Sequence, residues 1–481
     1  MNTATIITFL VYLAGMLAIG VIAYRATRGL SDYILGGRSL GSAVAALSAG
    51  ASDMSGWLLL GLPGALYASG LNQIWIAVGL TIGAFLNWQY VAAPLRRYSE
   101  SANDSITLPD FLENRLNDHS RILRVVSALV ILLFFTIYTS AGLVGGAILF
   151  EKSFDMTYHS ALLLGAAVIV SYTFIGGFLA VSWTDFVQGI LMFIALLVVP
   201  TYAFHIMGGW DGTLEKIASM DATYLDAFHS TGVIGAISLA AWGLGYFGQP
   251  HILARFMAIR SPAEVPQARF IGMTWMVAGL YGAIFTGLAA FAYFADNPLE
   301  DSETAFIALS QTLLNPWIAG ILLAAILSAI MSTVDSQLLV SSSALTEDFY
   351  KSFVNPKAGQ SELVWIGRAA VVGIALIAVA LAWNRDSSVL DLVSYAWAGF
   401  GAAFGPLVLL SLLWRGLTRH GAIAGMLGGA VTVVIWKQLS GGLFDLYEIV
   451  PGFLIGGGLA ILISIWVGGP DEDIKAEFDR I

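Results

Sequence analysis

Long apolar runs alternate with short polar segments along almost the whole chain. Most of the runs reach the roughly 20 residues that a helix needs to cross the hydrocarbon core of a bilayer. Such long continuous runs, without strict alternation, predict helices rather than strands. The pattern predicts thirteen transmembrane helices, at residues 6–23, 40–68, 74–92, 122–150, 161–180, 186–206, 234–256, 271–294, 316–345, 369–383, 389–414, 422–436 and 449–467. Segments 369–383 and 422–436 are short for a span, and we expect them to extend into their flanks.

The positive charges of the polar segments indicate how these spans are oriented. With the N-terminus outside, 18 of the 22 Lys and Arg residues lie in inner segments and 4 in outer ones. An excess of Lys and Arg in cytoplasmic loops is the usual bias of membrane proteins. The count therefore predicts an outside N-terminus and a cytoplasmic C-terminus. The inner group includes Arg25, Arg28, Arg115, Arg124, Arg255 and Arg480, and the outer group is Lys152, Lys216, Arg385 and Lys437.

Composition supports a polytopic membrane protein and narrows its chemistry. The chain is 58% hydrophobic and 11% charged, with mean hydropathy +0.80, whereas soluble domains have about 25% charged residues. The absence of cysteine excludes disulfides and thiolate catalysis. The 6 scattered histidines do not favour a zinc or iron site, and the net charge of −10 leaves no nucleic-acid footprint. Without a P-loop, a zinc-protease motif or a nucleophile elbow, an enzyme is not expected.

The second span is interrupted in its middle, between residues 47 and 57, by small and hydroxylic residues around Asp53. An acid at the centre of a membrane helix costs about 2.5–3.5 kcal/mol on insertion scales. Gly50 and Gly56 loosen the helix on either side. Carbonyl oxygens freed by such a break are hard ligands suited to Na⁺. Alternatively, Asp53 is an interior acid satisfied by backbone donors.

The seventh span contains a second interruption, because residues 242–250 hold three glycines and a proline. The two interrupted spans are five spans apart, so two five-span units that begin with them must be inverted relative to each other. Spans 2–6 (residues 40–206) and 7–11 (residues 234–414) are therefore predicted to be inverted repeats, with spans 1, 12 and 13 outside them, all within one transporter domain of residues 1–481. Discontinuous helices in matching positions point to a binding site at the membrane midplane. Alternatively, the glycines only allow close packing.

Polar residues in the ninth and sixth spans extend this hypothesis. Ser332 and Thr333 lie three and four residues after Ala329, so the three share a helix face and make about half of a Na⁺ cage. The alternative is that the hydroxyls bond carbonyls of their own helix. Asp335, nearer the cytoplasm, lines an ion exit or caps polar neighbours. Asp185, near the start of the sixth span, caps that helix or receives the departing ion.

Aromatic residues accompany both interruptions. They are Trp57, Tyr138, Trp242 and Tyr246. Membrane aromatics usually form interfacial belts, but Trp57 and Trp242 lie too deep in their spans for a belt. Rings beside a helix break suit a small ligand with an apolar body.

Several long motifs resemble a known family. Residues 33–41, 46–57, 172–185 and 416–422 are similar to motifs of the sodium:solute symporters. Residues 242–256 and 394–406 most resemble the proline-transporting bacterial members of that family. The likeness runs from about residue 12 to residue 451. It implies a LeuT-type core of two inverted five-helix repeats in the bacterial inner membrane, L-proline as substrate, Na⁺ as coupling ion, and neither an organic cofactor nor an obligate protein partner.

The resemblance also implies roles for individual residues. The Na⁺ ligands would be the backbone oxygens of Ala51, Met54 and Ala329 and the hydroxyls of Ser332 and Thr333. The proline site would be bordered by Ser55, Gly56, Trp57, Tyr138, Trp242, Tyr246 and Pro250. Asp53 would govern sodium affinity and coupling, Arg38 matches a cytoplasmic residue linked to coupling, and Asp185 matches a position tied to a sodium path or to a second sodium.

Other functions stay open at this stage. The same scaffold could carry pantothenate, another amino acid or a sugar, although the aromatic, glycine-rich break does not favour a sugar. A transporter-like sensor would need an appended signalling domain, and residues 468–481 after the last span are short for one. An ion channel would need a continuous pore and would not explain an aromatic pocket.

Overall fold

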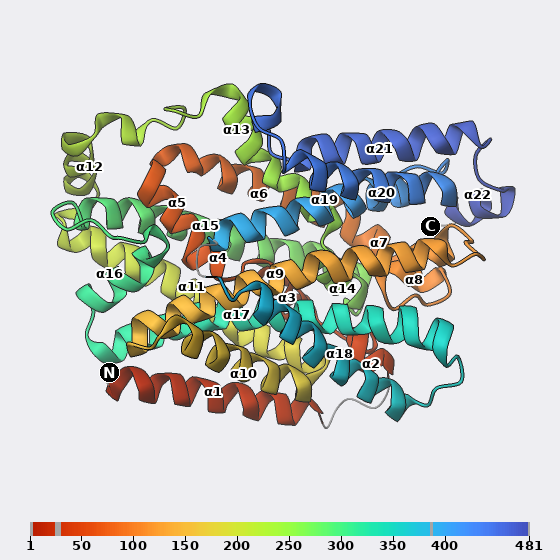
Figure 1. Cartoon of the computed structure of the whole chain (residues 1–481), viewed down its shortest axis with the longest axis horizontal. Coiled ribbons are helices and arrows are strands. Elements are labelled where there is room, and N and C mark those ends of the chain that lie inside the picture. Colours follow the sequence, from red (N-terminus) through yellow and green to blue (C-terminus); the bar gives the residue numbers. More distant parts are fainter. Residues whose placement is uncertain (1–2, 25–29, 385–387, 480–481) are drawn as a thin grey trace.

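The computed structural model describes residues 3–24, 30–384 and 388–479, and these residues form a bundle of helices (Figure 1). The long helices are α1 (Thr3–Tyr24), α3 (Ser42–Asp53), α6 (Ile74–Asn87), α9 (Ile122–Phe154), α10 (Tyr158–Gly176), α11 (Phe178–Ile206), α12 (Gly209–Met220), α15 (Val265–Tyr293), α17 (Pro316–Ser343), α18 (Gln360–Leu381), α19 (Val389–Leu413), α20 (Arg419–Trp436) and α21 (Ile449–Trp466). Arg25, Arg28, Arg385 and Arg480, which entered the charge count, lie outside the described ranges.

Shorter helices and turns complete the bundle. They are α2 (Leu30–Leu35), η1 (Gly36–Arg38), α4 (Gly56–Leu59), α5 (Gly61–Ser69), η2 (Leu71–Gln73), η3 (Trp88–Ala92), α7 (Ala93–Ser101), α8 (Leu108–Arg115), η4 (Ala222–Leu225), α13 (Gly232–Ala240), η5 (Ala241–Gly248), α14 (Pro250–Ala258), η6 (Pro262–Glu264), η7 (Ser302–Thr304), α16 (Ala305–Leu313), η8 (Ala344–Val354), η9 (Gly442–Asp445) and α22 (Glu472–Phe478). In Figure 1, α1 lies along one edge, α20 and α21 lie along the opposite edge, and α3, α4, α9 and α17 meet between them.

The helices confirm a multi-pass membrane protein. Within the described residues, ten helices are long and apolar enough to cross a membrane, or eleven if the bent pair formed by residues 42–53 and 56–69 is one span. Two further apolar helices, Tyr158–Ser171 and Gly232–Gly248, are shorter. The count of thirteen spans therefore stays a prediction. The two segments predicted to be short do extend into their flanks, because α18 begins at Gln360 and α20 at Arg419.

The boundary between the fifth and sixth predicted spans is corrected by the structure. The chain turns at Gly177, and α11 begins at Phe178 rather than at residue 186. Gly177 has φ +88°, and a Cβ there would lie 2.8 Å from Cδ2 of Tyr33, so only glycine allows this sharp turn. Asp185 therefore lies inside α11. The interpretation of Asp185 as a helix cap is wrong.

The predicted interruption of the second span is confirmed. Helix α3 ends at Asp53, and α4 begins at Gly56 with Ser55 as its N-cap. The Ser55 hydroxyl accepts a hydrogen bond from the Trp57 N–H, which satisfies one of the free donors at the start of α4. The two halves of the span are bent by 71°. The backbone between Asp53 and Gly56 therefore leaves the helical hydrogen-bond pattern inside the bundle.

The seventh span is interrupted as well. A 3₁₀ turn, η5, follows α13, and α14 starts at Pro250, whose missing N–H costs nothing at a first helical position. The backbone of η5 packs directly on α6. A Cβ at Gly83 would lie 2.1 Å from the Gly243 carbonyl oxygen. Close packing and a helix break therefore occur together here. The glycines both interrupt the helix and allow close packing, so the two interpretations given above do not exclude each other.

Candidate functional site

Helices α3 and α17 share a cluster of buried oxygen atoms beside the first break. The Ser332 hydroxyl lies 2.8 Å from the Ala51 carbonyl oxygen and 3.2 Å from that of Ala329. The Thr333 hydroxyl lies 3.4 Å from the same Ala51 oxygen. Four of the five predicted sodium-ligand groups therefore meet at one place. Met54, the fifth, caps α3 three residues after Ala51 and is also buried.

The alternative reading of these hydroxyls, as partners of their own helix, describes the cluster only in part. Ser332 donates within α17 to Ala329, but it also contacts Ala51 of α3 at the shorter distance. A hydroxyl that faces two carbonyl oxygens is arranged as a hard cation requires, because such cations are held by several oxygen atoms at once.

Asp53, the last residue of α3, connects the two breaks. Its Oδ2 accepts a hydrogen bond from the Tyr246 hydroxyl of η5. Its backbone oxygen accepts hydrogen bonds from the Tyr138 hydroxyl and from the Trp57 indole N–H, each at 3.3 Å. Within the described residues, the carboxylate of Asp53 therefore receives its hydrogen bond from a phenol, the side chain of Tyr246. The interpretation of Asp53 as an acid satisfied by backbone donors is wrong.

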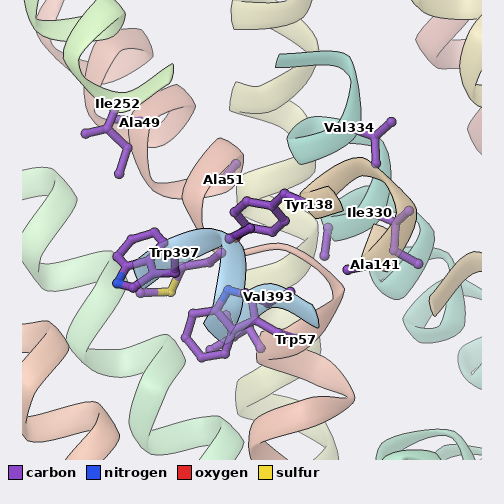
Figure 2. Close-up of a cluster of buried hydrophobic side chains, with 14 of the residues drawn as sticks. Ala49, Ala51, Trp57, Tyr138, Ala141, Ile252, Ile330, Val334, Val393 and Trp397 are labelled. Atoms are coloured by element: carbon purple, nitrogen blue, oxygen red, sulfur yellow. The ribbon is translucent and has the colours of Figure 1, made fainter. Parts of the chain in front are cut away.

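Aromatic rings surround the same point. In Figure 2 the side chains of Trp57, Tyr138 and Trp397 gather near Ala51. The rings of Trp57 and Trp242 are 5.9 Å apart, and Trp397 lies 6.4 Å from Trp242. These rings are at most 4% exposed, which confirms that Trp57 and Trp242 do not belong to an interfacial belt.

Trp397 was not assigned a role from the sequence. Its indole N–H donates to the Trp242 carbonyl at 2.7 Å, and its ring contacts Tyr246 edge-on at 5.2 Å. A Cβ at Gly245 would lie 1.9 Å from Trp397 Nε1, so glycine is needed for this contact. The available signal was a lone tryptophan among the small residues of segment 394–406.

Three further predicted substrate-site residues are placed by the backbone. Ser55 caps α4, and Gly56 lies against α17, where a Cβ would be 3.0 Å from Cγ1 of Ile330. Pro250 begins α14 and lines a narrow cavity together with Val340 and Asp348. Pro250 thus borders a cavity whose lining also includes residues of α17 and η8.

Asp185 forms a fully buried ion pair with Arg255 of α14, with 3.0 Å between Oδ2 and Nη2. Ser48 donates to the same Asp185 oxygen at 2.7 Å, and Arg255 contacts Ser336 at 2.6 Å. The pair ties α11 and α14 to α3 and α17. Breaking a buried pair on one side typically costs about 3–5 kcal/mol, because the remaining charge is left without compensation.

Arg255 was missed as a functional candidate and was counted as a loop charge. The structure corrects this, because its side chain is fully buried inside α14. The signal was its position inside the predicted span 234–256, where it is the only Lys or Arg residue.

Asp335 belongs to the same polar cluster. It is fully buried on α17, and its Oδ1 accepts a hydrogen bond from Ser336, which also contacts Arg255. The cluster therefore contains two acids, Asp185 and Asp335, and one base, Arg255. It lies beside the predicted sodium ligands, toward the C-terminal end of α17. A role for Asp335 and Asp185 in an ion path stays a prediction.

Arg38 lies away from the breaks, in the turn η1. Its guanidinium donates to the Met257 carbonyl and the Ser105 carbonyl, each at 2.8 Å, and pairs with Asp104 at 2.9 Å. The contact with Met257 attaches this turn to the end of α14, the second half of the interrupted seventh span. Through this contact Arg38 is linked to the interrupted seventh span.

The sequence profile of the sodium:solute symporter family matches residues 33–429 of the chain. The chain belongs to the sodium:solute symporter family. Its similar relatives include the sodium/proline symporters of Salmonella typhimurium (54% identity, 100% of this chain and 96% of that protein) and Escherichia coli (54%, 99% and 96%). The high-affinity proline transporter of Bacillus subtilis is 53% identical over 96% of this chain and 98% of that protein. The protein is thus a transporter and not an enzyme.

Solved structures with the same fold are also sodium- or cation-linked transporters by name. A Na⁺-coupled sialic acid symporter in a substrate-bound outward-open state matches with TM-score 0.81 at 18% identity, over 98% of this chain and 99% of that chain. The nucleobase-cation-symport transporter Mhp1 matches with TM-score 0.57 at 14% identity, over 94% and 98%. At these identities the likeness establishes the fold, which is the LeuT-like fold that the resemblance implied.

Proposed function

We propose that this protein takes up L-proline together with Na⁺ across the bacterial inner membrane by alternating access. The closest support is the full-length similarity to sodium/proline symporters. The observation in the structure that carries the proposal is the contact between Ser332 of α17 and the Ala51 carbonyl beside the first break, next to the acid that joins both breaks.

The proposed architecture has thirteen spans, with the N-terminus outside and the C-terminus in the cytoplasm. Residues 40–206 and 234–414 form its two inverted repeats. Each repeat begins with an interrupted helix, at 53–56 in the first and at 241–250 in the second. In transporters built this way, substrate and coupling ion bind where the interrupted helices face each other.

The proposed Na⁺ site uses the carbonyls of Ala51, Met54 and Ala329 and the hydroxyls of Ser332 and Thr333. Carbonyl and hydroxyl oxygens supply partial negative charge without a formal charge, so Asp53 provides the nearby full charge that tightens Na⁺ binding. Asp185, Asp335 and Arg255 form the polar cluster through which we propose that the ion leaves toward the cytoplasm.

The proposed proline site lies among the aromatic rings at the breaks. Its residues are Ser55, Gly56, Trp57, Tyr138, Trp242, Tyr246 and Pro250. The apolar ring of proline suits the faces of Trp57 and Trp242, and the free backbone groups at the breaks are suited to its charged ends.

Coupling follows from the shared elements of the two sites. A Na⁺ ion that binds both α3 and α17 stabilises the arrangement in which the first break faces the second, and proline needs that arrangement. Each ligand then raises the affinity of the other by the same factor. One Na⁺ moving down ~100 mV releases ~2.3 kcal/mol, and a roughly tenfold Na⁺ gradient adds ~1.4 kcal/mol. One Na⁺ per proline would therefore sustain an accumulation of several hundred-fold.

The first prediction is that purified protein in proteoliposomes accumulates labelled proline when an inward Na⁺ gradient is imposed. A K⁺ gradient of equal size is the control and should drive no accumulation. Uptake that ignores the Na⁺ gradient would disprove the coupling. Unlabelled proline should inhibit the uptake of labelled proline more strongly than pantothenate, other amino acids or sugars do. Stronger inhibition by one of these compounds would indicate that it, and not proline, is the preferred substrate.

The second prediction concerns the Na⁺ ligands. Ser332→Ala and Thr333→Ala should each raise the Na⁺ concentration for half-maximal uptake by roughly ten- to hundred-fold. This is the change in affinity expected when a binding site loses one polar contact to a charge. Ser328→Ala is the matched control, because Ser328 is buried on the same helix but donates to Ala324 one turn earlier. Equal Na⁺ dependence in all three variants would remove these hydroxyls from the site.

A further inference from the structure

Asp53 and Asn87 line a small cavity on the α6 side of the first break. Its volume is about 20 Å³, and it is lined by Asp53, Asn87, Tyr246, Ala49, Met54 and Met276, among others. Asn87 is the last residue of α6 and is 1% exposed. The sequence around Asn87 carries no motif that indicates a role for it.

Hydrogen bonds connect three of these residues into an open ring. The Tyr246 hydroxyl donates to Asp53 Oδ2, and the Asn87 amide donates to the Tyr246 carbonyl at 2.9 Å. This second bond determines which way the Asn87 amide points, because its nitrogen must face the carbonyl. Its oxygen is therefore the atom left for another partner.

The two ends of the ring are both buried acceptors. Within the described part of the chain, Asp53 Oδ1 and Asn87 Oδ1 have no hydrogen-bond partner. Leaving a buried acceptor unpaired costs about 1–3 kcal/mol, and more for a charged group. Asp53 and Asn87 both line the cavity, and two acceptors cannot satisfy each other, so a group that donates to both is required.

The cavity has the size for one such group. A water molecule needs about 10–15 Å³ and two to four polar partners, and this cavity offers both. The rest of its lining is mostly apolar, with Ala49 and Met276 on its walls, so a polar occupant finds its partners at Asp53 and Asn87.

We propose that this cavity binds one water molecule, which donates one hydrogen bond to Asp53 Oδ1 and one to Asn87 Oδ1. The water closes the ring and holds both carboxylate oxygens of Asp53. Asn87 is thereby a positioning residue for the coupling acid, although it is not one of the proposed Na⁺ ligands. The inference rests on the proposed function in one respect, that Asp53 sets the Na⁺ affinity.

The consequence is that the Na⁺ affinity depends on a residue of α6. With Oδ1 held by water and Oδ2 by Tyr246, the side chain of Asp53 stays turned toward α6 and η5, while its backbone oxygen faces Tyr138 and Trp57. Without the water, the carboxylate is stabilised on one oxygen only and is free to rotate or take up a proton.

The test compares Asn87→Leu with Asn87→Ala in Na⁺-dependent proline uptake. Leucine fills the cavity with an apolar group, so we expect the half-maximal Na⁺ concentration to rise roughly ten- to hundred-fold. Alanine enlarges the cavity and admits water that still reaches Asp53, so its rise should be clearly smaller. A purely structural role predicts the opposite order, because the larger cavity costs more stability.

Asn72→Ala is the matched control. Asn72 is buried just before α6 and also donates its amide to a backbone carbonyl, that of His229, but faces no carboxylate of the site. Its Na⁺ dependence should match that of the unaltered protein. An unchanged Na⁺ dependence of Asn87→Leu, or a larger effect of alanine than of leucine, would overturn the proposal.

An experimental structure that resolves ordered water provides the second measurement and does not depend on whether the variants fold. It should show a density peak about 2.8 Å from both Asp53 Oδ1 and Asn87 Oδ1, with or without Na⁺. A peak that appears only with Na⁺ would identify a cation instead and would overturn the proposal, as would the absence of a peak. Failure of the proposed function is separate, because the unaltered protein would then show no Na⁺-driven proline uptake.

Discussion

Asp53→Asn is expected to raise the Na⁺ concentration for half-maximal proline uptake by about a hundred-fold. The substitution removes the full negative charge at the break, and two unit charges about 6 Å apart interact by ~2.8 kcal/mol at an effective dielectric constant near 20, which corresponds to about a hundred-fold in affinity. Asparagine keeps an oxygen that can accept the Tyr246 hydroxyl, so the link between the two breaks survives. The measurement is uptake of labelled proline over a wide range of Na⁺ concentrations.

Asp391→Asn is the control for this change. Asp391 lies in the first turn of α19 and is exposed, so its charge is screened by water. Its loss should leave the Na⁺ dependence unchanged. If Asp53→Asn and Asp391→Asn have the same Na⁺ dependence, the role assigned to Asp53 is wrong.

Gly83→Ala is expected to separate α6 from the second break and to lower proline uptake more than ten-fold. The new Cβ would lie 2.1 Å from the Gly243 carbonyl oxygen and 2.5 Å from Gly243 Cα. Both are backbone atoms, so η5 itself must move, and the cost should exceed the ~1–3 kcal/mol of ordinary overpacking. Such a movement would also pull the Tyr246 carbonyl away from Asn87.

The measurements for Gly83→Ala are thermal stability of the purified protein and Na⁺-driven proline uptake. Gly373→Ala on α18 is the matched control, because a Cβ there has no neighbouring atom within 4 Å. This control should keep both properties. A Gly83→Ala protein as stable and as active as the control would show that η5 tolerates displacement.

The helices and their interruptions were predictable from the sequence because both depend on local properties. An apolar run of sufficient length must form a helix in lipid, since no other structure satisfies its backbone there. Glycine and proline weaken that helix at their own positions. The breaks around Asp53 and at residues 241–250 follow from these two rules. The start of α11 did not, because apolar residues continue through the turn at Gly177.

The contacts of the candidate site were less predictable, because their partners are far apart in the chain. Nothing near Asp185 in the sequence indicates that its partner is Arg255. The count of loop charges also treated Arg255 as a loop residue, although its side chain is buried and paired with Asp185. Trp397 and Asn87 likewise gained their candidate roles only through contacts with η5.

By itself, therefore, the sequence determined a helical membrane protein with two interrupted spans. It also determined that an acid, Asp53, lies at the first interruption and that two hydroxyl side chains, Ser332 and Thr333, share a helix face in the ninth predicted span. These features depend on neighbours within about one helical turn. Only the tertiary structure decided that Ser332 faces Ala51, that Tyr246 holds Asp53, and that Asn87 shares a cavity with the same acid. The physical reason is that hydrogen bonds and steric fit act over a few ångströms, and folding alone brings residues that lie from tens to hundreds of positions apart within that distance.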